Sequence, residues 1–480
     1  MIMHVLSVRM SSAVKGMIRI MKIVVLNGSP KGDSSVTMQY VAFMQKKLPQ
    51  HDFKIVNIAQ RIKKIESDEQ IFGEITGEIK SADGIIWAFP LYVFLVHSGY
   101  KRFIELITER AAGDIFQGKH AAILTTSIHF YDHTAHNYMH GICDDLNMKF
   151  YASYSAGMHD LFKEKERAKL LDFSQGFFES ITRDAPAIKV YPALINQSQE
   201  YVPGTDLVPV KTHGRKVVVL TDSKEDNINL NRLIGRFGDL LSGQVEVYNL
   251  HSLDIKGSCL GCIRCGYDNT CVYSGKDEFI DFYNSKLKSA DILVFAGTIH
   301  DRYLSSLWKT FFDRGFFNTH TPSFSGLQIA FLISGPLGQL PNLRQIMEAY
   351  TEWQQANLVG IVTDEHPNSA EIDGMLQELA QRSIDYSNLR YVKPATFLGV
   401  GGTKVFRDDI WGPLRFPFRA DHRFYKSNGI YDFPQKDYSS RMQNYFLGLL
   451  VKIPFIRKEI YGKLMITKMV EPFKKLVAKI

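Results

Sequence analysis

The chain has 480 residues, of which 45% are hydrophobic and 22% are charged, and its formal net charge is +7. This length suits roughly two to four domains, and the composition excludes a disordered, collagen-like or coiled-coil chain. No apolar run is long enough to predict a membrane-spanning helix. Residues 441–480 hold nine Lys/Arg against two acids, so the remainder is neutral and a nucleic-acid partner is not indicated.

Cysteine usage and the N-terminus bear on the compartment. Only five cysteines are present, and four of them fall within residues 259–271. A disulfide framework is therefore excluded, and a metal or cluster site in a reducing compartment is indicated, so we expect a cytoplasmic protein. Residues 1–20 lack the pattern of a secretory signal and are expected to be a disordered extension before a strand that begins at Lys22.

An internal repeat organises the sequence. Residues 80–105 (KSADGIIWAFPLYVFLVHSGYKRFIE) align without a gap with residues 288–313 (KSADILVFAGTIHDRYLSSLWKTFFD), at an offset of 208. The first strands of the two copies, 22–26 and 216–220, align at an offset of 194. The second copy has therefore gained residues between these two segments, and that interval contains the four clustered cysteines.

Each copy is predicted to fold as βα units. Short apolar runs at 22–26, 84–89 and 120–125, and again at 216–220, 291–296 and 328–333, alternate with amphipathic stretches such as 35–48 and 228–242. This pattern predicts an α/β fold of two doubly wound parallel sheets. We expect domains at 21–185 and 214–405, a proline-rich linker at 186–213, an irregular aromatic and arginine-rich cap segment at 406–440, and a basic amphipathic helical tail at 441–480.

The loop after the first strand, NGSPKGDSSVT (27–37), has the composition of a phosphate site. Small residues let backbone amides converge on an anion, a helix follows, and hydroxyl donors come from Ser29, Ser34, Ser35 and Thr37. The loop is neither a Walker loop nor a dinucleotide fingerprint, so a monophosphate such as FMN fits best. The alternative is a serine-rich turn that only caps the helix.

A further loop follows the strand at 120–125 and would lie at the same sheet edge. Thr126, Ser127 and His129 are candidates for contacts with flavin or substrate. His133, His136 and His140 could share one helical face, which leaves a metal site as a less favoured alternative.

Together, NGSPKGDSSVT and AFPLYVFLVHSGYKRFIE resemble the NADPH-dependent FMN reductase and iron–sulfur flavoprotein family. The resemblance implies two tandem flavodoxin-like domains and, in the first, an FMN. Its phosphate would be held by the loop that contains Ser29, Lys31, Ser34, Ser35 and Thr37. Its ring would lie on a loop formed by Pro90, Leu91, Tyr92, Val93 and Phe94.

The second copy differs at the same positions. Its first loop, 221–227, has lost the glycines and gained acids, so FMN binding there is doubtful. It carries instead the pattern C-x2-C-x2-C-x5-C, formed by Cys259, Cys262, Cys265 and Cys271, which suits a 4Fe-4S cluster and matches the same family. Thiols without a cluster and a structural zinc site remain alternatives.

The tail contains two amphipathic stretches, 442–453 and 457–479, separated by Pro454 and with Pro472 expected to kink or end the second. Apolar residues with lysines between them suit peripheral contact with an anionic membrane, at the inner face for a cytoplasmic protein. A helix packed on this protein or on a second copy is an equal alternative, and a homodimer is left open.

These patterns predict an FMN-dependent oxidoreductase. Electrons would pass between a reduced donor, ferredoxin or NAD(P)H, and a small-molecule or protein acceptor through FMN in the first domain and a 4Fe-4S cluster in the second. One alternative is an NAD(P)H-dependent FMN reductase of a small organic acceptor with vestigial cysteines. Another is a non-catalytic, membrane-associated redox sensor. No side chain identifies itself from the sequence as a catalytic acid, base or nucleophile.

Overall fold

The computed structural model describes residues 19–195, 199–433 and 437–479. The extension expected at the N-terminus therefore lies almost wholly outside the described residues. Described residues up to His422 belong to one compact unit, and those from Arg423 onward belong to a second.

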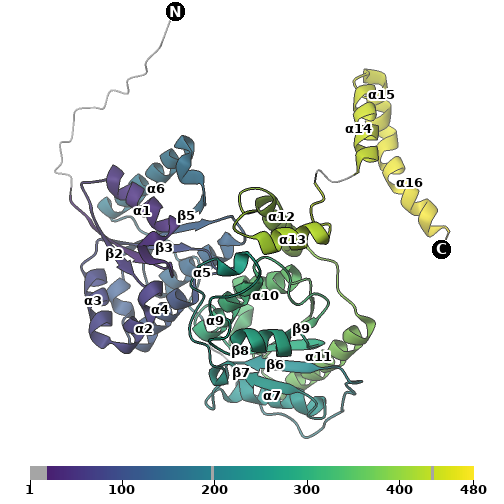
Figure 1. Ribbon diagram of the computed structural model, residues 1–480, viewed down its shortest axis with the longest axis horizontal. Coiled ribbons are helices and arrows are strands. Elements are labelled where there is room, and N and C mark those ends of the chain that lie inside the picture. The colour runs from purple at the N-terminus through teal and green to yellow at the C-terminus, as the bar shows by residue number, and fades with distance from the viewer. Residues whose placement is uncertain (1–18, 196–198, 434–436, 480) are drawn as a thin grey trace, which may run out of the picture. The chain divides into compact units, whose positions relative to one another are not determined.

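Two five-stranded parallel sheets lie in the first unit (Figure 1). The first has the order β2-β1-β3-β4-β5 and the second the order β10-β9-β8-β6-β7, so each copy repeats the same 2-1-3-4-5 topology. The first sheet contains β1 (Lys22–Asn27), β2 (Asp52–Asn57), β3 (Gly84–Pro90), β4 (His120–Ser127) and β5 (Lys149–Gly157). The second contains β6 (Val217–Thr221), β7 (Glu246–Asn249), β8 (Ile292–Thr298), β9 (Gln328–Ser334) and β10 (Asn357–Thr363). The two flavodoxin-like folds predicted from the repeat are confirmed.

Helices cover both faces of each sheet (Figure 1). The first copy has α1 (Val36–Lys47), α2 (Ile62–Ser67), α3 (Glu69–Lys80), α4 (Ser98–Glu109), α5 (Asp132–Asp145) and α6 (Glu164–Thr182). The second has α7 (Ile228–Leu240), α8 (Phe279–Phe282), α9 (Ser306–Gly315), α10 (Pro341–Trp353) and α11 (Ser369–Leu389). Central strands are apolar on both sides because each side is buried under helices, as β3 and β8 show.

Two findings correct the expectations for the C-terminal quarter. The cap segment is not irregular, because it contains α12 (Phe397–Trp411) and α13 (Arg419–Ser427). The tail forms α14 (Tyr438–Leu450), α15 (Pro454–Glu459) and α16 (Met465–Val477), and Pro472 lies inside α16 without ending it. Among the described residues, no helix is both long and apolar enough to cross a membrane.

Helices α4 and α9 join the two copies through a reciprocal contact. The backbone N–H of Ser98, at the start of α4, donates to Asp313 of α9 at 2.8 Å. The backbone N–H of Ser306, at the start of α9, donates to Glu105 of α4 at 2.6 Å. Residues 98 and 105 correspond to 306 and 313 at the repeat offset, so one hydrogen bond occurs twice about a pseudo-twofold axis. Each carboxylate also faces the positive end of the other helix dipole.

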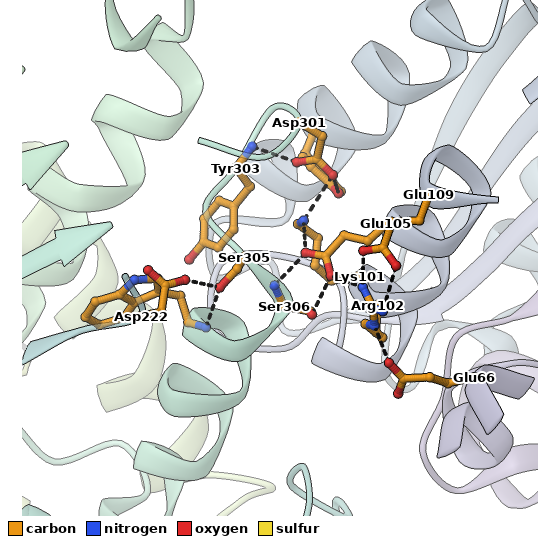
Figure 2. A network of polar contacts seen from close by, with 12 residues as sticks. Glu66, Lys101, Arg102, Glu105, Glu109, Asp222, Asp301, Tyr303, Ser305 and Ser306 are labelled. Carbon is orange, nitrogen blue, oxygen red and sulfur yellow. Dashed lines mark hydrogen bonds and ion pairs between the residues drawn. The ribbon is translucent and has the colours of Figure 1, made fainter. Parts of the chain in front are cut away.

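A buried lysine accompanies each of these carboxylates. Lys101 Nζ lies 2.7 Å from Glu105 and 3.0 Å from Asp301, and its side chain is fully buried. Lys309, its counterpart in α9, is equally buried and pairs with Asp313. Figure 2 shows the network around Lys101, which extends through Arg102 to Glu66 and Glu109.

The pKa of Glu105 shows how strongly this network stabilises the ionised form of its carboxylate. Burial alone would raise the pKa of Glu105, but Lys101 and the hydrogen bonds from Ser306 and Arg102 outweigh burial and lower it to about 2. Because the folded-state pKa is depressed, the stabilisation is present above the ordinary value of 4.5 and is lost as the pH falls toward 2.

We predict that Lys101→Met lowers the free energy of unfolding by about 3–5 kcal/mol, because Glu105 and Asp301 would stay buried without their counter-charge. Urea denaturation followed by circular dichroism measures this loss. The matched control is Lys169→Met, which removes an exposed partner of Glu166 and should cost less than about 1 kcal/mol. Equal effects of the two substitutions would contradict the importance of the buried pair.

Candidate functional site

The loops after β1, β3 and β4 open on one cavity of about 240 Å³. They lie at the carboxyl ends of the strands, where the strand order of the first sheet reverses between β1 and β3, and this is where doubly wound sheets bind ligands. The lining from these loops consists of Lys31, Ser35, Val36, Pro90, Leu91, Tyr92, Val93, Thr126, Ser127, Ile128 and Phe130.

The structure separates the predicted phosphate residues into two groups. Lys31 and Ser35 line the cavity, and Ser35 also begins α1 by accepting the backbone N–H of Met38 at 3.3 Å. Ser29 is buried and accepts the N–H of Lys31, while Thr37 bonds Thr126 Oγ1 at 2.6 Å.

Ser34 is exposed and does not line the cavity. Ser29 and Thr37 therefore shape the loop, and Lys31, Ser35 and the N-terminus of α1 are left to meet an anion.

A tight turn forms the predicted ring loop. Tyr92 and Leu95 exchange two backbone hydrogen bonds of 2.9 Å, which places Val93 and Phe94 between them at φ angles of 29° and 65°. Such angles are costly for a β-branched residue, and strain of this kind concentrates at functional sites.

Phe94 does not line the cavity; its ring is buried against Phe130 and Trp353 and anchors the turn. Pro90, Leu91, Tyr92 and Val93 thus face the cavity, held in place by the buried Phe94.

Thr126 and Ser127 line the cavity, whereas His129 lies beside it in an adjoining hollow. His129 Nδ1 lies 3.0 Å from Asp132, and this hydrogen bond raises the pKa of His129.

The three histidines considered for a metal site have protein contacts instead. His136 bonds Thr125, His133 bonds Gln345, and His140 stacks on Phe150. The described residues contain no group of His, Cys, Asp or Glu arranged to hold a metal ion.

All four clustered cysteines line the same cavity as the loops after β1, β3 and β4. A hydrogen bond joins the cysteine loop to the first copy. His97 Nε2 donates to the carbonyl of Cys259 at 2.8 Å, while His97 Nδ1 accepts the N–H of Gly99. The ring of Tyr92 packs edge-on against His97 at 4.8 Å.

Gly261 has φ +62°, and a Cβ there would lie 2.1 Å from Tyr92 Oη, so no other residue fits beneath the tyrosine. The predicted ring loop of one copy thus rests on the cysteine loop of the other.

The four thiols are free, and those of Cys259 and Cys265 lie in a desolvated setting. Burial, reinforced by neighbouring charges, raises the pKa of both Cys259 and Cys265 to about 12, so these thiols are uncharged in the absence of a metal. Four thiol groups that share one cavity are a suitable donor set for iron. The side chains are not arranged around a metal position, and the 4Fe-4S cluster stays a prediction.

Comparison with known families bears on this site. Residues 21–159 match the family model of NADPH-dependent FMN reductase. The match contains all three loops that open on the cavity, so the resemblance expected from the loops of the first copy is confirmed. It supports an FMN-dependent oxidoreductase.

Solved structures similar to the chain each cover about a third of it. An NADH:FMN oxidoreductase (EMOB, apo form) aligns at 16% identity over 33% of this chain and 89% of that chain, with a TM-score of 0.29. The NAD(P)H:(acceptor) oxidoreductase FerB from Paracoccus denitrificans aligns at 17% identity over 34% and 99%, with a TM-score of 0.29. An FMN-dependent NADH-azoreductase from Bacillus anthracis, in complex with FMN, aligns at 16% identity over 34% and 99%, with a TM-score of 0.26. No curated protein matches the sequence.

The loop of the second copy that corresponds to the phosphate loop is closed by its own side chains. Ser223 Oγ donates to Asn231 at 2.8 Å, and the N–H of Lys224 donates to Asn227 at 2.9 Å. Asp222 is buried where the first copy has Gly28, and its carboxylate accepts a hydrogen bond from Ser305 (Figure 2). A buried carboxylate at this position disfavours a phosphate.

The remaining wall of the cavity was not identified from the sequence. It comes from the second copy and the cap segment and contains Arg314, Phe316, Phe317, His320, Trp353, Phe406, Leu414 and Phe418. Arg314 is buried and pairs with Asp277 at 2.7 and 3.0 Å. The abundance of aromatic residues in 406–440 was the only sequence signal for this wall.

Proposed function

We propose that the protein is an oxidoreductase that binds FMN in the cavity between its two copies and takes reducing equivalents from NAD(P)H. The observation that carries the proposal is the convergence of the three loops of the family-matched segment on one cavity. FMN supplies the chemistry when bound, because it accepts a hydride and releases electrons singly or in pairs.

The residues of the cavity fit such a ligand at both ends. Lys31, Ser35 and the N-terminus of α1 offer a cation, a hydroxyl and a helix dipole to the phosphate. The turn from Pro90 to Val93 offers an apolar surface to the flavin ring, and Thr126 and Ser127 add hydroxyl groups beside it. The aromatic wall from the second copy and the cap segment adds apolar surface on the other side of the cavity.

We predict that Lys31→Glu weakens FMN binding by about 10- to 100-fold, because it replaces a charge-assisted contact with a repulsive one. Flavin fluorescence titration measures the change, and NAD(P)H oxidation should fall with FMN occupancy. The matched control is Glu225→Lys, the corresponding position of the second copy, which should leave both unchanged. If only Glu225→Lys altered FMN binding, the flavin would be bound by the second copy and the proposed site would be wrong.

We further propose that Cys259, Cys262, Cys265 and Cys271 hold a 4Fe-4S cluster that exchanges single electrons with a carrier such as ferredoxin. The spacing of the cysteines and their place in the flavin cavity support it. If the thiols bind no cluster, the alternative is an NAD(P)H-dependent FMN reductase of a small organic acceptor. If the protein shows no turnover with any donor, the alternative is a non-catalytic redox sensor.

Anaerobic reconstitution should yield about four iron atoms and one FMN per chain. Cys262→Ser should lower the iron content, because it removes one ligand at an exposed position where folding is least disturbed. Cys143→Ala, which changes a buried cysteine away from the cavity, should retain full iron. Iron and acid-labile sulfide assays decide the matter, and two FMN with no iron, or zinc in place of iron, would contradict the cluster.

We also propose that residues 441–480 bind an anionic membrane surface. Helices α14 to α16 expose large apolar side chains, among them Phe446, Phe455 and Phe473, and the segment carries an excess of lysine and arginine. Each basic residue near an anionic surface contributes about 1 kcal/mol.

A chain ended after Asp437 should lose sedimentation with phosphatidylglycerol vesicles and keep its FMN. Phosphatidylcholine vesicles are the control and should bind neither form. Vesicle binding that survives the truncation, or none by the full chain, would reduce the tail to a packing element.

A further inference from the structure

A buried imidazole–carboxylate pair forms part of the cavity wall that comes from the second copy and the cap segment. His320 lines the cavity, and its Nδ1 lies 2.6 Å from Asp421 Oδ2. Asp421, in the first turn of α13, is fully buried and also accepts the backbone N–H of His320 at 3.2 Å and the hydroxyl of Thr319. One carboxylate thus holds both the ring and the backbone of the histidine.

The surroundings prevent the imidazole from turning away. Its ring centroid lies 4.1 Å from that of Phe406, 4.5 Å from that of Phe418 and 5.1 Å from that of Phe316. Thr319, immediately before it, has φ 56°, a conformation that costs energy for a β-branched residue and persists only where the surroundings enforce it.

Several other polar groups of the cavity are poor sources of a proton, and burial raises the pKa of Tyr273, Cys259 and Cys265 among them. Arg314 is held by two hydrogen bonds to Asp277, and a guanidinium does not serve as a proton donor in proteins. Burial raises the pKa of Tyr92 well above its ordinary value. Lys31 and Ser35 belong to the phosphate end. Imidazole is the side chain that ordinarily exchanges protons near neutral pH, and a carboxylate on Nδ1 fixes its tautomer and orientation.

We propose that His320 is the proton donor for reduction of an organic acceptor in this cavity and that Asp421 is its positioning residue. The inference rests on the proposed function. An acceptor with a carbonyl oxygen or imine nitrogen takes up two electrons and two protons; a hydride accounts for both electrons and one proton, and imidazolium His320 gives the second. NAD(P)H is the reductant and becomes NAD(P)⁺, and solvent returns the proton to His320. The aromatic wall favours a flat acceptor.

Two acceptors with different proton demands test the role in the FMN-loaded full chain. Duroquinone must be protonated as it is reduced, whereas ferricyanide takes electrons alone. His320→Gln should lower the NADPH-dependent turnover number with duroquinone by about 10²–10⁴-fold and leave ferricyanide turnover within about threefold. Asp421→Asn should show the same selectivity, and His251→Gln, at an exposed histidine of the second copy, should change neither.

Two further measurements separate a chemical role from a structural one. FMN occupancy, measured by absorbance, should be the same in all variants. Proton NMR of the unreduced protein should show a far-downfield Nδ1–H resonance that both His320→Gln and Asp421→Asn remove.

Equal losses with the two acceptors, or undiminished duroquinone turnover in His320→Gln, would overturn the role of His320. If the unsubstituted protein reduces neither acceptor, the proposed function is wrong. This outcome differs from a failure of the His320 proposal, in which the unsubstituted protein is active.

Discussion

The structure depends on the exchange of carboxylates between α4 and α9. Each helix begins with an N–H that donates to a carboxylate of the other copy, Glu105 or Asp313, and each carboxylate is held by a buried lysine of its own helix. Buried charges of this kind are costly to leave unpaired, so the two sheets have a strong preference for one relative arrangement. Arg302 adds a two-pronged contact with Asp145, at 2.7 Å for both bonds, beside the same interface.

This arrangement explains how two similar folds form one composite site. The turn at Tyr92 leads directly into α4, and the cysteine loop lies beside α9, so pairing the helices brings Tyr92 onto Gly261 and His97 onto the carbonyl of Cys259. In the first copy, Lys31 and Ser35 of the predicted phosphate loop line the cavity, whereas the corresponding loop of the second copy is filled by its own hydrogen bonds. Each copy therefore contributes a different wall to the cavity, and Phe406 of α12 with Leu414 and Phe418, which follow that helix, adds a third.

The repeat predicted most of the fold, because the same hydrophobic pattern occurs twice and a doubly wound sheet follows from βα alternation. The position of the cavity followed from the loops after β1 and β3, since ligands bind where strand order reverses. Individual contacts were less predictable. Ser29 and Thr37 carry hydroxyl groups that could bind phosphate, but these groups form hydrogen bonds with Lys31 and Thr126 within the protein. The sequence alone does not show these contacts.

The helices of the cap segment were the main part of the fold that the sequence did not predict. Helix α12 contains Gly399, Gly401 and Gly402, which disfavour a helix in isolation. Glu352, from α10, accepts the N–H groups of Thr396 and Gly399 and so stabilises the first turn, a contact between distant parts of the chain. The pairing of His320 with Asp421 was likewise not predicted, because it joins residues about a hundred positions apart in the sequence.

The proposed function places one flavin between the two copies, against Tyr92 on one side and the cysteine loop on the other. A crystal structure of the protein with FMN bound tests it most directly. We expect a single FMN, with its phosphate at Lys31 and the N-terminus of α1 and its ring in the shared cavity. Density for FMN at residues 221–229 of the second copy, or a ring outside the cavity, would contradict it.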